Sequence, residues 1–438
     1  MALKADELQI VYVKDLVELN LRIPNYQRPY KWSKNSALTL FNDLYEAYLN
    51  GLDEYRIGTV ILHFSGDEYH IVDGQQRITT LGIFLSKMQR KPAINKIANL
   101  EYNNLSFSAI QENARIISSK LNELDEITRT KFENYILDKC SLVKIVIEDN
   151  ENENDAIQEA FQFFDSQNTR GKSLEPHDLL KSYHLREMNR DTEEEKLRIV
   201  NKWESINQQQ LSKMFEVYLY PLVQWYRYKS GYGYTSKNIA TFKGVKIDNL
   251  YNYALYHKAA NLFVEQINAT KISELMSSAP LNQFQLTQPI ISGKRFFAYV
   301  AHYIHLCEMV EKRIKNLFTE DERPTRRSGD IYVYQMFVCV AIFFADKFGV
   351  EYLSDAILHK LYFWSYCLRI EMQAVYQQTI NRYAMGHHNR GIDINMFAYI
   401  NDLNEPSEMD LLTFDDYKLK EGVNSAIMEK MRSIKEGE

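Results

Sequence analysis

The chain has 438 residues, of which 45% are hydrophobic and 25% are charged, and its formal net charge is −6. This composition is that of a globular protein with a substantial buried core, so it excludes a mainly disordered chain. The acidic balance also excludes a protein whose main task is to coat nucleic acid, because that binding depends on clustered Lys and Arg. Local contact with DNA remains compatible with it.

Length, cysteine spacing and hydropathy predict a two-domain cytoplasmic protein. Domains of roughly 100 to 200 residues make two the expected number here. The N-terminal segment is interrupted by charges, and no run of about 18 uncharged apolar residues occurs, so we expect neither secretion nor a membrane span. The cysteines form no CxxC pair, which favours a reducing compartment over disulfides or a thiolate zinc site. They are Cys140, Cys307, Cys339 and Cys367.

The first part of the chain, residues 1–190, is predicted to be an α/β or α+β domain, and we take α+β as the fold class. Residues 55–64, 69–72 and 142–147 are short runs rich in β-branched residues, which predict strands. Turn residues or helical stretches separate these runs.

The second part, residues 191–438, is predicted to be a mainly α-helical domain for DNA or partner recognition. Apolar residues recur every three or four positions in four long stretches with few strand signals. The stretches are residues 193–224, 294–317, 331–348 and 352–369, with loops expected at 230–236 and 321–330. The many aromatic residues follow the same spacing, which favours core packing over base stacking.

A first polar constellation lies in residues 23–32 (IPNYQRPYKW). Two prolines favour an extended path, so Arg28, Tyr30 and Trp32 would project from one side of the segment. An Arg flanked by aromatic rings can clamp a phosphate and a base. The alternative is an Arg that simply stacks on a surface aromatic ring.

A second constellation follows the strand at residues 69–72. Asp73-Gly74 predicts a tight turn, and Gln75 to Met88 predicts an amphipathic helix whose free N-terminal amides attract an anion. Arg77 can add a bidentate phosphate contact, and Thr79 or Thr80 a hydroxyl. Asp73 can hold a metal ion, a ribose hydroxyl or an attacking water. The alternative is that Asp73 caps the helix and pairs with Arg77.

A third constellation lies in residues 163–183. Asn168, Arg170, Gly171 and Lys172 form a polar, cationic loop before a helical stretch. Such a loop suits phosphate or base contacts, and its alternative is an ordinary surface turn.

Together and in this order, these motifs resemble the N-terminal domain of the GmrSD family of modification-dependent (type IV) restriction systems, which has a ParB/sulfiredoxin-like fold. The DGQQR motif stands at residues 73–77, and R-x-Y-x-W at 28–32. The strand around Gly58 and the N-x-R-G and D-L-L-K elements within 168–181 also match. The resemblance covers about residues 8 to 190.

The resemblance implies an NTPase, with GTP, ATP or another NTP and Mg²⁺ or another divalent cation as cofactors. Arg28 and Arg77 would bind phosphates, Asp73 would hold the metal or orient water, and Gln75 or Gln76 would help to position that water. Gly74, Asn168, Arg170 and Lys172 would complete the nucleotide pocket. Hydrolysis would be coupled to the cleavage of modified phage DNA.

The helical part lacks a His-Ile-x-Pro-like element of a His-Asn-His (HNH) nuclease, so we expect a separate HNH partner to cut the DNA. An oligomer is compatible with this assignment. His302, His305 and Glu308 could bind a metal but are better explained by packing, and the loop at residues 387–390 could contact DNA or a partner.

Three alternatives have different support. A sulfiredoxin would need a cysteine near its phosphate-binding Arg, and no cysteine precedes Cys140. A ParB-like clamp would carry a basic helix-turn-helix, which the acidic balance does not support. A non-hydrolysing nucleotide or DNA sensor that recruits a nuclease remains open.

Overall fold

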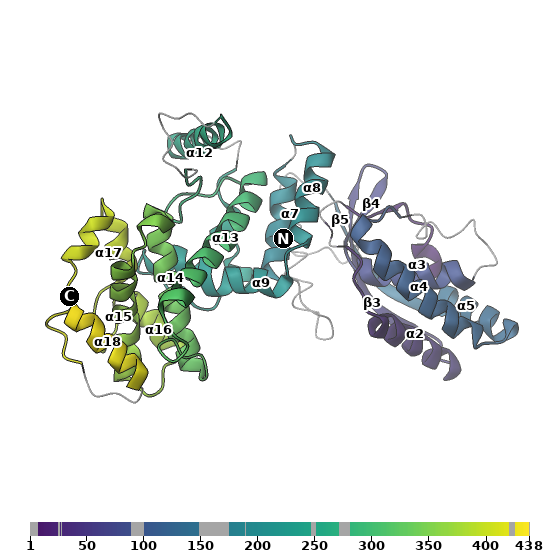
Figure 1. The fold of residues 1–438 in the computed structure, drawn as a ribbon. Helices are drawn as coiled ribbons and strands as arrows, with labels where there is room; N and C mark the ends of the chain where they lie inside the picture. The colour runs from purple at the N-terminus through teal and green to yellow at the C-terminus, as the bar shows by residue number, and fades with distance from the viewer. Residues whose placement is uncertain are drawn as a thin grey trace. The chain divides into compact units, whose positions relative to one another are not determined.

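The computed structural model contains two compact units, an N-terminal unit and a helical unit (Figure 1). The N-terminal unit comprises Met1–Leu174 and Thr192–Ser205, and the helical unit comprises Glu175–Asp191 and Ile206–Glu438. The structure describes residues 8–24, 27, 29–88, 100–148, 175–188, 190–246, 251–270, 281–419 and 425–437.

A mixed five-stranded sheet forms the centre of the N-terminal unit, with the strand order β1-β5-β3-β4-β2. Strands β3 and β4 form an antiparallel hairpin, and β5 pairs with β3 in parallel. At the two edges of the sheet, β1 pairs antiparallel with β5, and β2 pairs parallel with β4. The three predicted strands correspond to β3, β4 and β5, whereas the short β1 and β2 have no counterpart among the predicted strands. The strands are β1 (Leu8–Tyr12), β2 (Leu21–Arg22), β3 (Tyr55–Ser65), β4 (Glu68–Asp73) and β5 (Cys140–Glu148).

Helices pack against this sheet and bury its core. Val60, Leu62 and Ile71 point into that core, where they meet apolar side chains of the helices. Phe41 of α2 packs edge-on against Phe84 of α3, at 5.9 Å between ring centroids. The sheet and its helices confirm the predicted α+β class. The helices are α1 (Val13–Leu16), α2 (Lys34–Leu49), α3 (Gln75–Met88), α4 (Phe107–Asn122), α5 (Glu126–Lys139) and α8 (Glu193–Glu204), with a 3₁₀ turn at Asn104–Ser106.

The helical unit contains no strand longer than an isolated bridge among its described residues, so the predicted helical second part is confirmed. Helices α14 and α15 pack side by side (Figure 1). The α-helices are α7 (Pro176–Arg186), α9 (Gln208–Lys213), α10 (Tyr220–Trp225), α11 (Ala240–Lys243), α12 (Asn252–Thr270), α13 (Lys294–Leu317), α14 (Ser328–Phe348), α15 (Asp355–Glu371), α16 (Gln377–Ala384), α17 (Met396–Asp402) and α18 (Ser425–Gly437). A π-helical turn spans Met214–Leu219, and 3₁₀ turns span Ser236–Asn238, Val350–Tyr352 and Pro406–Leu411.

Two helix predictions need correction. The apolar spacing predicts one helical stretch over 193–224, but α8 ends at Glu204 and α9 begins at Gln208. The side chain of Asn207 accepts a hydrogen bond from the backbone N–H of Gln209 at 2.8 Å and so starts a new helix. The loop predicted at 321–330 ends earlier, because α14 begins at Ser328.

Helix α14 is the apolar centre of the helical unit. Among the described residues, it is the one helix long and apolar enough to cross a membrane. However, 67% of its most apolar window is buried inside the unit, as expected for the core helix of a globular fold.

One carboxyl group, Asp346 near the end of α14, is enclosed in this core. Its oxygens accept hydrogen bonds from the Tyr303 hydroxyl at 2.6 Å and from the Leu286 N–H at 2.8 Å. Burial raises the pKa of Asp346 to about 7 despite both bonds. The folded protein therefore keeps a proton that the unfolded chain releases near the usual pKa of 3.8.

This difference predicts that Asp346 makes the protein less stable as the pH rises from 4 to 7. Over this interval the folded protein binds more protons at Asp346 than the unfolded chain, so the free energy of unfolding should fall as the pH rises. The difference in unfolding free energy between the wild type and Asp346→Asn should fall by about 2 kcal/mol between pH 5 and pH 7, as measured by urea denaturation. A difference that does not change with pH would contradict this.

Candidate functional site

The predicted strand, turn and helix of the DGQQR motif are all present. Strand β4 ends at Asp73, Gly74 adopts a φ of +93°, and α3 begins at Gln75. The first helical bond runs from the Ile78 N–H to the Gly74 carbonyl at 2.9 Å. A Cβ at Gly74 would lie 2.6 Å from Cγ1 of Val60, so both the backbone conformation and the packing require glycine.

The pairing of β3 with β4 contains a β-bulge next to Asp73. Leu62 pairs with Ile71, but the preceding residue Ile61 pairs with Asp73, so two residues of β4 oppose one residue of β3. Such bulges locally reorient side chains at the end of a strand. The Asp73 carboxylate lies 3.5 Å from Nη2 of Arg77, one helical turn further on. This is the ion pair considered as an alternative from the sequence.

The Arg77 guanidinium lies over the backbone of Gly58 in β3. Gly58 has a φ of +144°, and a Cβ there would collide with Nη1 of Arg77. The pairing of β3 with β5 shifts register at the same place, between Arg56 and Gly58. Arg77 is thus held by the carboxylate of Asp73 and by the bare backbone at Gly58, while 22% of its side chain remains exposed.

The start of α3 is suited to an anion. The first-turn N–H groups of a helix have no acceptor within the helix and lie at the positive end of its dipole. Gln75, the first residue, is only 4% exposed. Its Oε1 is buried and accepts no hydrogen bond within the described structure. An unpaired buried acceptor costs about 1–3 kcal/mol, so a water or ligand donor there would be favourable.

Gln76 serves a different purpose from the one expected. Its Oε1 accepts from the Lys31 N–H at 2.9 Å, and its Nε2 donates to the Pro29 carbonyl at 3.2 Å. Both ends of the amide therefore fix the extended segment around Tyr30 against α3. Gln76 therefore positions this segment through both ends of its amide.

Tyr30 and Thr80 also need correction, because the sequence suggested that both contact nucleotide. Tyr30 is fully buried, and its hydroxyl is 2.8 Å from the Thr80 hydroxyl and accepts from Nδ2 of Asn113 at 2.9 Å. Thr80 in turn donates to the Gln76 carbonyl. Tyr30 therefore does not project beside Trp32 as a surface clamp. It anchors the segment inside the domain.

The structure describes only two of the remaining residues that were predicted to contact nucleotide. Thr79 is fully buried, and Trp32 is partly buried and packs against the core. Arg28, Asn168, Arg170 and Lys172 lie outside the described residues.

Two neighbouring residues were missed from the sequence. Nε2 of Gln27 donates to the carbonyls of Ile71 and Val72, at 2.9 and 2.6 Å, and so fixes the end of β4. Nζ of Lys31 lies 3.3 Å from the buried Glu204 carboxylate of α8. Only the unusual sequence of residues 27–31 (QRPYK) could have indicated that Gln27 and Lys31 make these contacts.

The histidines considered for metal binding are explained by packing. Burial lowers the pKa of His302 to about 4, and its ring lies 4.9 Å from that of Tyr303. His305 and Glu308 are exposed on the same helix. Within the described ranges, no group of three or more His, Cys, Asp or Glu side chains could hold a metal ion.

Comparisons with known families match both parts of the chain. Residues 13–185 match the model described as GmrSD restriction endonuclease, N-terminal domain. The first part of the chain is therefore a GmrSD-type N-terminal domain, and this match supports a role in a restriction system, a class that acts in antiviral defence. Residues 195–427, more than half of the chain, match a second model, and the chain belongs to this family of unknown function (DUF7834). No curated protein matches the chain.

The buried Tyr30 network predicts a measurable loss of stability. Tyr30→Phe removes a hydroxyl that bonds Thr80 and Asn113 and leaves their polar atoms without this partner. We expect the free energy of unfolding to fall by about 1–2 kcal/mol in urea denaturation. Tyr45→Phe, at a partly buried ring packed against the same core, is the control and should cost less. Equal losses in both variants would contradict the network.

The contact between Gly58 and Arg77 predicts non-additive mutations. Gly58→Ala should destabilise the protein by about 1–3 kcal/mol, from backbone strain and from displacement of Arg77. Gly66→Ala is the control, because Gly66 also has a positive φ but a methyl group there would meet no atom within 4 Å.

In an Arg77→Ala background, the part of the Gly58→Ala cost that comes from displacing Arg77 should disappear, whereas the backbone strain at a φ of +144° should remain. A double-mutant cycle by urea denaturation measures this. Full additivity of Gly58→Ala and Arg77→Ala would show that the two sites do not interact.

Proposed function

We propose that the GmrSD-type domain binds a nucleoside triphosphate at the start of α3 and hydrolyses it. The observation that carries this proposal is the Arg77 guanidinium, which Asp73 and Gly58 hold at the first turn of a helix. A preoriented, partly exposed guanidinium beside the first N–H groups of a helix is a suitable site for phosphate. The Asp73–Arg77 pair need not oppose this role, because an ion pair can orient the guanidinium for a ligand.

Each residue has a distinct role in this proposal. Arg77 and the amides of Gln75 and Gln76 would bind phosphate oxygens, with Arg28, Asn168, Arg170 and Lys172 as further contacts expected from the sequence. The unpaired Oε1 of Gln75 is suited to accept a hydrogen bond from an attacking water. Gln76 and Tyr30 would act indirectly, by holding the 29–31 segment in place.

A divalent cation fits this site only in part. Asp73 is the one carboxylate of the motif, and it already faces Arg77. Mg²⁺ commonly takes one or two carboxylates and completes its shell with phosphates and water. Asp73 would therefore supply one ligand, and a bound Mg²⁺ would neutralise charge on the phosphates.

We further propose that hydrolysis licenses DNA cleavage by a separate HNH nuclease. The match to a restriction endonuclease N-terminal domain supports a nuclease partner, and the sequence of the helical part lacks an HNH-like element. The substrate expected from the family resemblance is modified phage DNA. The helical unit is the part available for DNA or partner recognition.

A second function is also supported by specific contacts. Asp73 is engaged by Arg77, and both ends of the Gln76 amide are engaged by backbone groups. A site with so few unengaged groups for activating water is consistent with a sensor that binds nucleotide without turnover and then recruits the nuclease.

Nucleotide binding and phosphate release together separate the two functions. Arg77→Ala should weaken binding of the preferred NTP at least tenfold, because it removes the charged phosphate contact. Asp73→Asn should retain binding within severalfold but reduce phosphate release about a hundredfold, if Asp73 acts in hydrolysis. Both are measured by calorimetry and phosphate release on purified protein, with and without DNA and the nuclease.

Arg56→Ala is a matched control on the same strand as Gly58. Arg56 is half exposed and pairs with Glu54 at 3.1 Å, so its loss should change neither binding nor release. Tight binding without release under all conditions would favour the sensor. Absence of binding to any NTP would reject both functions.

A further inference from the structure

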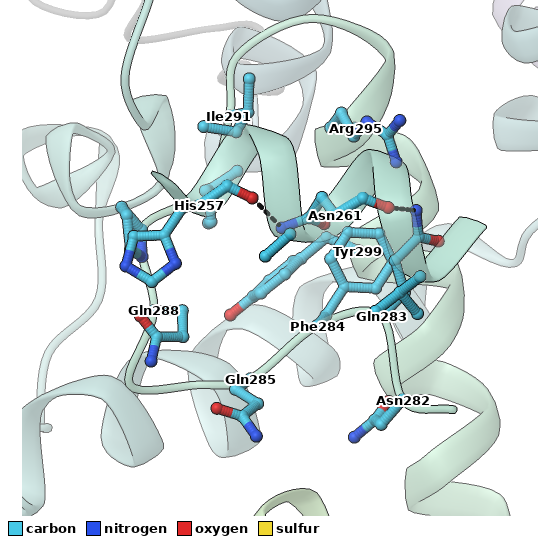
Figure 2. A pocket seen from close by; sticks show the side chains of 14 residues that line it. His257, Asn261, Asn282, Gln283, Phe284, Gln285, Gln288, Ile291, Arg295 and Tyr299 are labelled. Atoms are coloured by element: carbon cyan, nitrogen blue, oxygen red, sulfur yellow. Dashed lines mark hydrogen bonds between the residues drawn. The ribbon is translucent and has the colours of Figure 1, made fainter. Parts of the chain in front are cut away.

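The helical unit contains a pocket that neither matched family description explains. It has a volume of about 260 Å³ and lies between α12, the loop at residues 282–291 and α13. Figure 2 shows side chains from these three segments converging on it. The volume is near the lower end of small-ligand pockets, which are about 300–1,000 Å³, so it suits one compact ligand.

Hydrogen bonds fix the loop that forms one wall of the pocket. Asn268 of α12 bonds both the N–H and the carbonyl of Leu281, each at 2.9 Å. Further along, Asp346 accepts the Leu286 N–H, and the Ile290 carbonyl accepts the Val245 N–H at 2.8 Å. These bonds hold the wall in position before a ligand arrives, which reduces the entropy cost of binding.

The lining is rich in neutral amides and has almost no net charge. None of its side chains is a carboxylate, and its one permanent cation, Arg295, forms an ion pair with Glu265. Such a lining disfavours both phosphates and cations. Oε1 of Gln288 is buried and has no hydrogen-bond partner within the described structure. The carboxamides belong to Asn261, Asn282, Gln283, Gln285 and Gln288.

We propose that this pocket binds a single nucleobase. A base is neutral and planar and carries donors and acceptors along its edge, which an Asn or Gln amide can pair with two at a time. The amide nitrogens of Asn261, Asn282 and Gln283 already donate to backbone carbonyls, so we assign this pairing to Gln285 and Gln288.

The partly buried ring of Phe284 lines the same pocket and offers a surface for stacking. The Tyr299 ring also lines the pocket but is only 2% exposed and packs against Tyr303. A sugar fits less well, because its many hydroxyl donors are best accepted by carboxylates, which the lining lacks.

The base can come from a free nucleoside or from a strand of nucleic acid in which it is unstacked. The chemistry of the pocket is the same in both cases. The proposal goes beyond the phosphate site of the N-terminal unit, because it concerns different residues and a ligand without phosphate.

Titration calorimetry of the full chain tests the proposal with adenosine, guanosine, cytidine, thymidine and, separately, glucose. The protein carries Arg77→Ala, so that the phosphate site contributes little. We expect at least one nucleoside to bind with a Kd at or below about 1 mM, and glucose not to bind. A fluorescence titration with single-stranded DNA containing 2-aminopurine tests the second source.

Gln288→Leu should weaken this binding at least tenfold, and Phe284→Leu at least fivefold. Gln377→Leu, at an exposed amide on α16, is the matched control and should leave affinity unchanged. Thermal melting of each variant verifies that it folds. If only nucleosides bind, the ligand of the pocket is a free nucleoside. If only DNA binds, the ligand is an unstacked base within a strand.

Three results would overturn the proposal. They are the absence of binding by all nucleosides and by DNA, binding of glucose alone, and unchanged affinity in both folded pocket variants. NTP binding in the Arg77 wild-type background is measured in parallel. Failure at the pocket can therefore be distinguished from failure of the proposed NTPase.

Discussion

The contact between the Arg77 guanidinium and the backbone of Gly58 determines much of the N-terminal unit. It requires a residue without a Cβ in β3, a register shift beside β5, and a helix that begins directly after β4. The Asp73 carboxylate then fixes the remaining side of the guanidinium. A charged group is thus held near the surface by steric and electrostatic contacts, which leaves its exposed edge available for a ligand.

A second layer of contacts holds this arrangement from behind. The segment around Tyr30 is bonded to α3 through Gln76 and Thr80, and to α4 through Asn113. Because these groups are buried, each unmade bond would cost more than a bond at the surface. Some polar residues of the motif are therefore candidate ligand contacts, and others hold the structure together from inside. The type of residue alone does not show which of these two roles a position has.

The turn at Gly74 and helix α3 could be predicted because their signals are local. A β-branched run, an Asp-Gly turn and a helical apolar period follow one another within 20 residues. The burial of Tyr30 could not, because it depends on Asn113, which is 83 residues away in the sequence. The end of one helix and the start of the next near Asn207 did have a local signal, because Asn is a common helix-capping residue. The continuous apolar periodicity across this region predicted a single helix instead. The pocket beside α12 has no sequence motif, since its amides come from separate segments.

The placement of α8 has a consequence for dividing the protein. The chain leaves the N-terminal unit, forms α7 in the helical unit, and returns to add α8 before leaving again. Helix α8 supplies Glu204 to Lys31 and Asn201 to Asn103, at 3.3 and 3.0 Å. A fragment that ends near residue 190 would therefore expose the face that α8 covers and leave Lys31 without its buried carboxylate. Separating the two units cleanly requires more than a single cut in the chain.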